Sequence, residues 1–200
     1  MRRILVLVLA GLFAGAVALR AHRPQSARAA VPAPPGAQFS SDGKLVRPED
    51  YRRWVYVSSG FGMSYNPGAG ENGAPAFTNV FVVPAAYDFF RAHGTWPDKT
   101  AFVLEIYSSA SHGSINQKGS YQESLVGLDV EVKDESRFAD KWAYFNFDES
   151  SKSAPANPKT ACWQCHEDHA AVEHSFVQFY PTLKPVAKKF GTYKEAAENP

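Results

Sequence analysis

Residues 125–133 alternate between apolar and charged side chains, and this pattern restricts the segment to a β-strand. Successive side chains of a strand point to opposite faces, so one face of this strand is apolar and the other is polar. The apolar face holds Val126, Leu128, Val130 and Val132, and the polar face holds Asp129, Glu131 and Lys133.

Three further strands are predicted at 77–83, 101–107 and 141–147. The first ends at Pro84, and the second carries Phe102, Leu104 and Ile106 on one face. The stretches 60–75 and 149–160 are rich in loop-forming residues.

Three helices are predicted before, between and after these strands. A short one begins at Pro48 and carries Tyr51, Trp54 and Val55; the next covers 85–93, with Phe89 and Phe90 inward and Gly94 at its end. The third runs from about Ala161 to His169, with His174 as its furthest limit. The elements together predict an α+β domain, mainly an antiparallel β-sheet with a few helices.

The first 29 residues differ in composition from the rest. Arg2 and Arg3 precede the apolar run 4–19, and Ala27-Arg28-Ala29 follows as a small-x-small cleavage pattern. This is typical of a secretory signal sequence and predicts a periplasmic or otherwise exported protein. An uncleaved anchor is the alternative, although the 16 residues of 4–19 are short for a membrane span.

Composition also divides the remaining chain. Residues 30–45 are rich in Pro, Ala and Gly and predict a flexible linker, 46–186 form the folded domain, and 187–200 form a C-terminal tail. Removal of residues 1–29 would take away five arginines and no acidic residue. Lys+Arg would fall from 21 to 16 against 20 Asp+Glu, so the net charge of the remaining chain would be near −4. This balance offers no basic patch for nucleic acid.

The only two cysteines are separated by two residues and followed directly by a histidine, as Cys162-Trp163-Gln164-Cys165-His166. This C-x-x-C-H pattern is typical of c-type haem attachment. On the first turn of a helix, the two thiols reach the vinyl groups at one edge of a haem, and the histidine lies beneath the ring as an iron ligand. We therefore predict one covalent haem c, bound through Cys162 and Cys165 with His166 as axial ligand, on a helix near the C-terminus.

Three other interpretations compete with haem. A zinc site needs four ligands, and His169 or His174 would have to join the motif, whereas structural zinc sites usually bring a second, separated ligand pair. A thioredoxin-like motif lies early in its domain and has no need of the histidine. A lone disulfide is the remaining alternative in an exported protein.

The second axial position decides what the iron does. Met63 is the only methionine after the initiator and lies in a Gly-rich loop far upstream. His93 and His112 are alternative sixth ligands, although such isolated histidines are more often solvated. His169 lies on the same helix as His166 and therefore cannot reach the opposite face of the haem. We expect five-coordinate iron with an open side, which binds or reacts with a small molecule rather than only passing electrons.

With these features the chain resembles the cytochrome P-460 and cytochrome c′-beta family. The late C-x-x-C-H, followed by Phe-Val-Gln-Phe-Tyr-Pro-Thr-Leu at 176–183, carries the resemblance, and 51–55, 77–84, 96–98 and 142–147 support it. The resemblance implies a mainly antiparallel β fold, a homodimer, and a five-coordinate haem with histidine below. It also implies two activities: P-460 members oxidise hydroxylamine with a lysine cross-linked to the haem edge, and c′-beta members bind NO or CO behind an apolar, phenylalanine-capped face.

The cross-linking lysine distinguishes these two activities. The strand that aligns with the lysine-bearing strand, 101–107, contains no lysine, and Leu104 occupies about its place. Lys99 at the strand entrance and Lys118 in the following loop are the alternative cross-linking residues, although solvated surface lysines are the ordinary interpretation of both. We therefore expect a protein that handles small nitrogen-oxide or diatomic ligands, with a hydroxylamine-oxidising enzyme and a simple electron carrier as alternatives. No redox partner is indicated.

The wall opposite the histidine is expected to be apolar. Phe102 and Leu104 share one strand face, and Phe77 or Phe81 is expected to approach from the neighbouring strand. An aromatic-rich strand face is more often plain core, but a haem is a large apolar plate that the core must cover. Glu105 lies on the opposite face as a weak candidate for a general base. Arg52 and Arg53 are candidates for the haem propionates, although exposed helix arginines are the ordinary interpretation of both.

Overall fold

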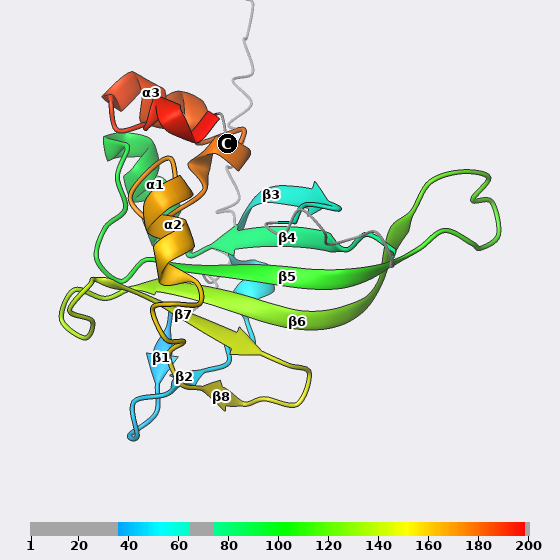
Figure 1. Cartoon of the computed structure of the whole chain (residues 1–200), viewed down its shortest axis with the longest axis horizontal. Coiled ribbons are helices and arrows are strands. Elements are labelled where there is room, and N and C mark those ends of the chain that lie inside the picture. Colours follow the sequence, from blue (N-terminus) through cyan, green and yellow to red (C-terminus); the bar gives the residue numbers. More distant parts are fainter. Residues whose placement is uncertain (1–35, 65–73, 199–200) are drawn as a thin grey trace, which may run out of the picture. The chain divides into compact units, whose positions relative to one another are not determined.

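The computed structural model describes residues 36–64 and 74–198, and its centre is an antiparallel sheet of five strands in the order β3-β4-β5-β6-β7 (Figure 1). The strands are β3 (Val55–Phe61), β4 (Phe77–Val82), β5 (Ala101–Ala110), β6 (Tyr121–Lys133) and β7 (Trp142–Phe147). Strands that follow one another along the chain are neighbours in the sheet. The fold is therefore mainly antiparallel β, as predicted, and the predicted signal sequence lies outside the described residues.

Short helices accompany the sheet. The α-helices are α1 (Pro84–His93), α2 (Trp163–His169) and α3 (Lys184–Phe190), and the 3-10 turns are η1 (Tyr51–Arg53), η2 (Val177–Phe179) and η3 (Glu195–Glu198). In Figure 1 α2 lies in front of β5 and β6, and the β5–β6 hairpin projects beyond the other strands. None of the helices in 36–64 and 74–198 is long and apolar enough to cross a lipid bilayer.

The boundaries of α1 follow from its first and last residues. Pro84 cannot donate to the sheet, so it ends β4 and occupies the first helical turn. Gly94 ends the helix in the left-handed conformation, with φ +73°, and its N–H donates to the Phe90 carbonyl. Phe90 is fully buried, but Phe89 is 37% exposed, which corrects the prediction that both face inward. Adjacent residues of a helix point about 100° apart, so one turn buries only one of them.

The register of the sheet decides which side chains share a face, because directly opposite residues of antiparallel strands point the same way. Leu104 lies opposite Val80 and Asp129, so we call this side the Leu104 face. It gathers Val80, Val82, Phe102, Leu104, Asp129, Glu131, Tyr144 and Asn146. The other side, the Glu105 face, gathers Asn79, Phe81, Val103, Leu128, Val130 and Phe145.

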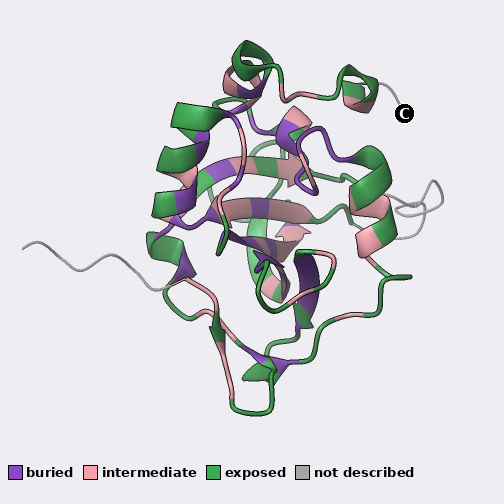
Figure 2. Ribbon diagram, turned by 90° about the vertical axis from the view of Figure 1, so that its left-hand side faces the viewer, coloured by how far each residue is buried: buried purple, intermediate pink, exposed green. Residues whose placement is uncertain are grey.

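A smaller antiparallel sheet is formed by β1 (Gln38–Phe39), β2 (Leu45–Val46) and β8 (Ser153–Ala154), in that order. Phe39 contacts Phe145 of the Glu105 face edge-on at 6.0 Å between ring centroids, and Leu45 is fully buried. Residues 38–39 and 45, which were predicted to lie in a flexible linker, are therefore part of this sheet. Figure 2 shows how the buried residues gather around the central strands.

Several predicted boundaries differ from the structure. The helix expected around 51–55 is one 3-10 turn, because Trp54 is extended and Val55 begins β3. The helix α2 ends at His169, since Ala170 is extended. The predicted tail from 187 is partly folded: α3 continues to Phe190, and Ala187 is fully buried.

Candidate cofactor pocket

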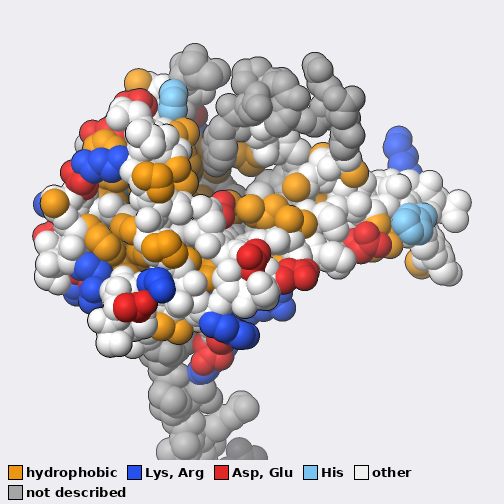
Figure 3. Space-filling model, turned by 60° about the horizontal axis from the view of Figure 1, so that its bottom comes forward, with side chains coloured by type: hydrophobic (Ala, Val, Ile, Leu, Met, Phe, Trp, Pro, Cys, Tyr) orange, Lys and Arg blue, Asp and Glu red, His pale blue; other side chains and the backbone are white. Residues whose placement is uncertain are grey.

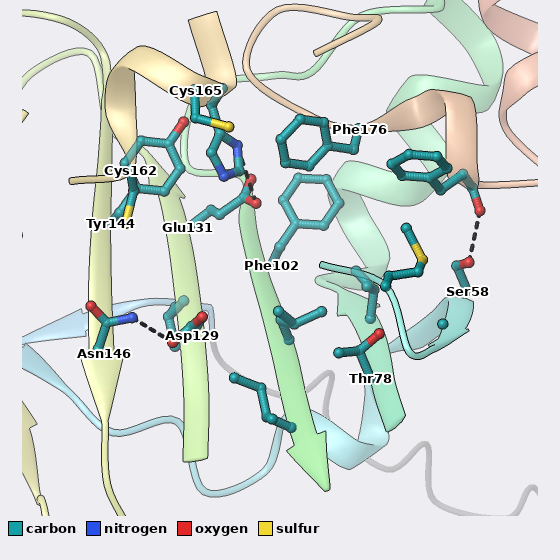
Figure 4. Close-up of a pocket in the computed structure, with 18 of the residues that line it drawn as sticks. Ser58, Thr78, Phe102, Asp129, Glu131, Tyr144, Asn146, Cys162, Cys165 and Phe176 are labelled. Carbon is teal, nitrogen blue, oxygen red and sulfur yellow. Dashed lines mark hydrogen bonds and ion pairs between the residues drawn. The ribbon is translucent and has the colours of Figure 1, made fainter. Parts of the chain in front are cut away.

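A cavity of about 520 Å³ lies between the Leu104 face of the sheet and the segment that contains α2 and η2 (Figure 4). This is within the usual range for small-molecule and cofactor pockets. Cys162, Cys165 and His166 all line it, so the structure brings the three residues of the predicted attachment motif to one cavity.

The two thiols lie at the start of α2. Cys162 is the residue before the first helical position and Cys165 lies in the first turn, which places both on the cavity side. Both are free cysteines, and burial raises the pKa of each thiol. The Nδ2 of Asn157 lies 3.5 Å from the Cys162 sulfur. The thiols are therefore available for covalent attachment.

The imidazole of His166 is prepared to ligate a metal through one nitrogen. Burial lowers its pKa to about 4, so the ring is neutral at neutral pH. Its Nδ1 lies 2.7 Å from the backbone carbonyl of His174, which can only accept, so the proton is on Nδ1. The lone pair of Nε2 remains for a metal. The ring lies between Tyr144 and Phe176, each 4.4 Å away between ring centroids.

The segment after α2 closes the cavity from above. Gln178 holds it in place, because its Oε1 accepts from the Ala171 N–H at 3.1 Å and its Nε2 donates to the His169 carbonyl at 2.9 Å. Phe176, Phe179 and Tyr180 then line the cavity. The Phe-Val-Gln-Phe-Tyr-Pro run of the sequence is thus the segment that covers the predicted haem motif.

Two carboxyl groups of β6 also line the cavity. Burial raises the pKa of Glu131 to about 8, and its Oε1 lies 3.5 Å from Nδ1 of the neutral His166, so the two form no ion pair at neutral pH. Asp129 accepts a hydrogen bond from Asn146, and burial raises its pKa. Sequence reasoning placed these acids on the polar face of their strand but did not connect them with the site. The missing information was the register that sets Glu131 opposite Phe102.

The predicted distal residues divide between the two faces. Phe102 and Leu104 line the cavity. Phe77 and Phe81 do not, and this corrects the prediction: Phe77 contacts Phe61 at 4.4 Å, and Phe81 packs edge-on against Tyr51. Both lie on the Glu105 face because they pair with Tyr107 and Val103 of β5 rather than with Phe102 or Leu104.

Neither predicted lysine lies at the cavity. Lys99 forms an ion pair with Asp134 and donates to Ser136 at 2.9 Å. Lys118 is exposed in the loop between β5 and β6. Among the described residues, the cavity lining includes no lysine and no arginine. Leu104, which stands at about the position expected for the cross-linking lysine, is part of the cavity wall.

The polar candidates of the Glu105 face serve the fold instead. The carboxylate of Glu105 accepts from the Tyr51 hydroxyl at 2.6 Å, from Arg52 Nε at 2.8 Å and from Asn79 Nδ2 at 3.0 Å. Arg53 forms an ion pair with Asp50. Glu105, Arg52 and Arg53 are therefore not positioned as a base or as propionate ligands in this cavity.

Met63 is a cavity residue that the sequence reasoning set aside because of its distance along the chain. It follows β3, and its sulfur lies against Gly60, where an added Cβ would come within 2.6 Å of it. His93 instead stacks on Phe89 at 4.0 Å, and His112 lies in the exposed β5–β6 loop. Recognising β3 as the neighbour of β4 would have identified Met63.

The residues present fit a covalently attached haem. They provide two free thiols at the correct spacing, a neutral imidazole with one free nitrogen, and an adjoining wall that contains apolar side chains. Within 36–64 and 74–198, no three His, Cys, Asp or Glu side chains are grouped to hold a metal ion, so the zinc interpretation gains no support.

Comparison with known proteins agrees with this arrangement. A family model described as Cytochrome P460 matches residues 48–177, well over half of the chain. The match begins at the residues before η1, includes β3 to β7, and ends after the C-x-x-C-H motif. No curated protein matches the chain.

Proposed function

The chain belongs to the cytochrome P460 family, and on this premise we propose that it is an exported mono-haem c-type cytochrome that binds or handles small nitrogen-oxide or diatomic ligands such as NO and CO. The observation that carries the proposal is the convergence of Cys162, Cys165 and the free nitrogen of His166 on one cavity. When bound, haem supplies an iron that accepts a small ligand opposite the histidine.

The residues around the cavity support ligand binding more than hydroxylamine oxidation. Phe102 and Leu104 provide apolar cover, and the described lining contains no lysine that would cross-link a haem edge. Burial raises the pKa of Glu131 to about 8, so this side chain is mostly protonated at neutral pH and adds little negative charge to the cavity. Apolar cover of this kind favours small neutral ligands over charged ones, because burying an unpaired charge is costly.

Two measurements on the purified holoprotein test this function. Intact mass after denaturation should equal the polypeptide plus one haem, and ferrous protein should give a new absorption spectrum on adding CO. A third covalent link, from a lysine to the haem in addition to the two cysteine thioethers, would support the hydroxylamine-oxidising alternative; mapping of proteolytic fragments would find it. A polypeptide without haem mass contradicts the proposal entirely.

An electron carrier remains the second candidate, because Met63 lines the cavity and methionine thioethers ligate haem iron in such proteins. Five-coordinate iron predicts that Met63→Leu leaves the ferric and ferrous spectra unchanged. Loss of a methionine–iron charge-transfer band in Met63→Leu, together with failure of the wild-type ferrous protein to bind CO, would favour the electron carrier.

Location and assembly follow as parts of the same proposal. We expect the chain in the periplasm, without residues 1–29, and as a homodimer with no nucleic-acid partner. Figure 3 shows basic and acidic side chains beside one another on the face it presents, rather than a patch of one sign. N-terminal sequencing of the periplasmic protein tests export and cleavage, and light scattering coupled to size-exclusion chromatography tests the dimer.

A further inference from the structure

The turn that follows α2 presents one backbone group to the candidate iron ligand. Residues 172–175 form this turn, with an isolated antiparallel bridge between Val172 and Ser175. Glu173 within it adopts φ +51°, a conformation that costs a non-glycine residue about 1–2 kcal/mol. The turn directs the His174 carbonyl at His166 Nδ1, 2.7 Å away. A strained turn keeps this geometry only when contacts from the surrounding structure support it.

Contacts from the far side of the turn supply this support. The indole N–H of Trp96 donates to the hydroxyl of Ser175, which in turn donates to the Val172 carbonyl at 2.9 Å. The backbone N–H of Trp96 donates to Glu173 Oε1 at 3.1 Å. Lys133 Nζ completes the set by donating to Glu173 Oε2 and to the Trp96 carbonyl, both at 2.7 Å.

These supporting residues are shielded from solvent. Trp96 is 2% exposed, Ser175 is fully buried and Lys133 is 7% exposed. A buried lysine ammonium is costly unless it is paired, and here it joins the end of β6 to the turn. None of these residues lines the cavity, so the cluster supports the turn without being part of the cavity wall.

We infer that Trp96, Lys133, Glu173 and Ser175 are positioning residues for the iron ligand, acting through the His174 carbonyl. A hydrogen bond to the outer nitrogen of a metal-ligating histidine fixes the ring and raises its basicity as a ligand. A more basic imidazole stabilises ferric over ferrous iron, so the cluster holds the reduction potential low. The inference rests on the proposed function only in that His166 ligates the iron.

The test compares conservative variants of the holoprotein. Trp96→Phe removes the indole N–H but keeps a ring against Phe90 and Phe102, and Ser175→Ala removes the hydroxyl that accepts from it. Trp54→Phe is the matched control, because the buried indole N–H of Trp54 has no hydrogen-bond partner in the described part of the chain.

We expect Trp96→Phe and Ser175→Ala to shift the ferric-to-ferrous equilibrium up to tenfold toward ferrous iron, which is 59 mV for one electron. The iron–histidine stretching band of the ferrous resonance Raman spectrum should move to lower frequency. Potentials and bands equal to those of Trp54→Phe in both variants would overturn the inference. CO binding, measured on the same samples, reports separately on the proposed function: its absence contradicts that function, and unchanged potentials contradict the positioning role.

Discussion

Tyr51→Phe tests whether the hydrogen bonds to Glu105 hold the sheet together on the side away from the cavity. The Tyr51 hydroxyl donates to the Glu105 carboxylate at 2.6 Å, and the Glu105 side chain is only 4% exposed. Water therefore cannot replace the lost donor. A hydrogen bond to a charged group contributes about 1.5–3 kcal/mol, so we expect the free energy of unfolding to fall by about 2 kcal/mol at pH 7.

The pH dependence of this loss follows from the pKa of Glu105. Burial raises that pKa, but donors from Tyr51, Asn79 and Arg52 outweigh burial and hold it below its usual 4.5. A lowered folded-state pKa gives stability that is fully present above the unfolded pKa and is lost as the pH falls through the folded value. The difference between wild type and Tyr51→Phe should therefore shrink as the pH falls below 4.5.

Urea unfolding of the holoprotein, followed by circular dichroism from pH 7 downward, measures both quantities. Tyr56→Phe is the control, because Tyr51 and Tyr56 both pack edge-on against Phe81, at 5.7 and 5.8 Å. Tyr56 is 53% exposed and its hydroxyl bonds Ser59 instead of a carboxylate, so its loss should cost less than about 0.5 kcal/mol. Equal losses in the two variants, or a Tyr51→Phe loss independent of pH, would refute the reasoning.

Three further predictions follow from single residues. Gly94→Ala should lower the free energy of unfolding by about 2–4 kcal/mol, because φ is +73° and the new Cβ would lie 2.5 Å from the Phe190 side chain. Gly43→Ala is the control in the same denaturation assay. Gly43 has a similar φ but no atom within 4 Å of the new Cβ, so this change should cost only about 1–2 kcal/mol. Cys162→Ser and Cys165→Ser should each keep haem through the remaining thioether, whereas the double variant should release its haem to acidified organic solvent. Release of haem from either single variant under the same extraction would contradict two attachment points. Phe102→Leu should change the CO affinity of ferrous protein, whereas Phe81→Leu, on the opposite face, should not.

The central elements could be predicted because their local patterns agree with their packing. The segments expected as strands correspond to β4, β5, β6 and β7, and Gly94 ends α1 as its left-handed conformation requires. The strand β3 was missed because Tyr51 and Trp54 have helical spacing. Both residues are buried, but only Tyr51 lies in the single 3-10 turn, and the chain is already extended at Trp54. Periodicity over so few residues cannot distinguish a single turn from a helix.

The site was predictable where the chemistry lies in adjacent residues and not where it depends on register. Cys162, Cys165 and His166 are neighbours along the chain, so their common cavity follows from one helical turn. Phe77 and Phe81 were assigned to this cavity because they lie on a neighbouring strand. A shift of one residue in register moves every side chain of a strand to the opposite face, and sequence alone does not determine it.

The polar side of β6 shows why alternation alone does not locate solvent. Asp129 and Glu131 alternate with Leu128 and Val130, as in a strand with one solvent-exposed face, yet both acids are only partly exposed and line the cavity. The cavity side is closed by the segment after α2, whose position depends on Gln178 and on the turn at 172–175. Burial then raises the pKa of both acids. The polar face of the strand thereby becomes part of the wall of the candidate cofactor pocket, and only the tertiary contacts of a distant segment decide this.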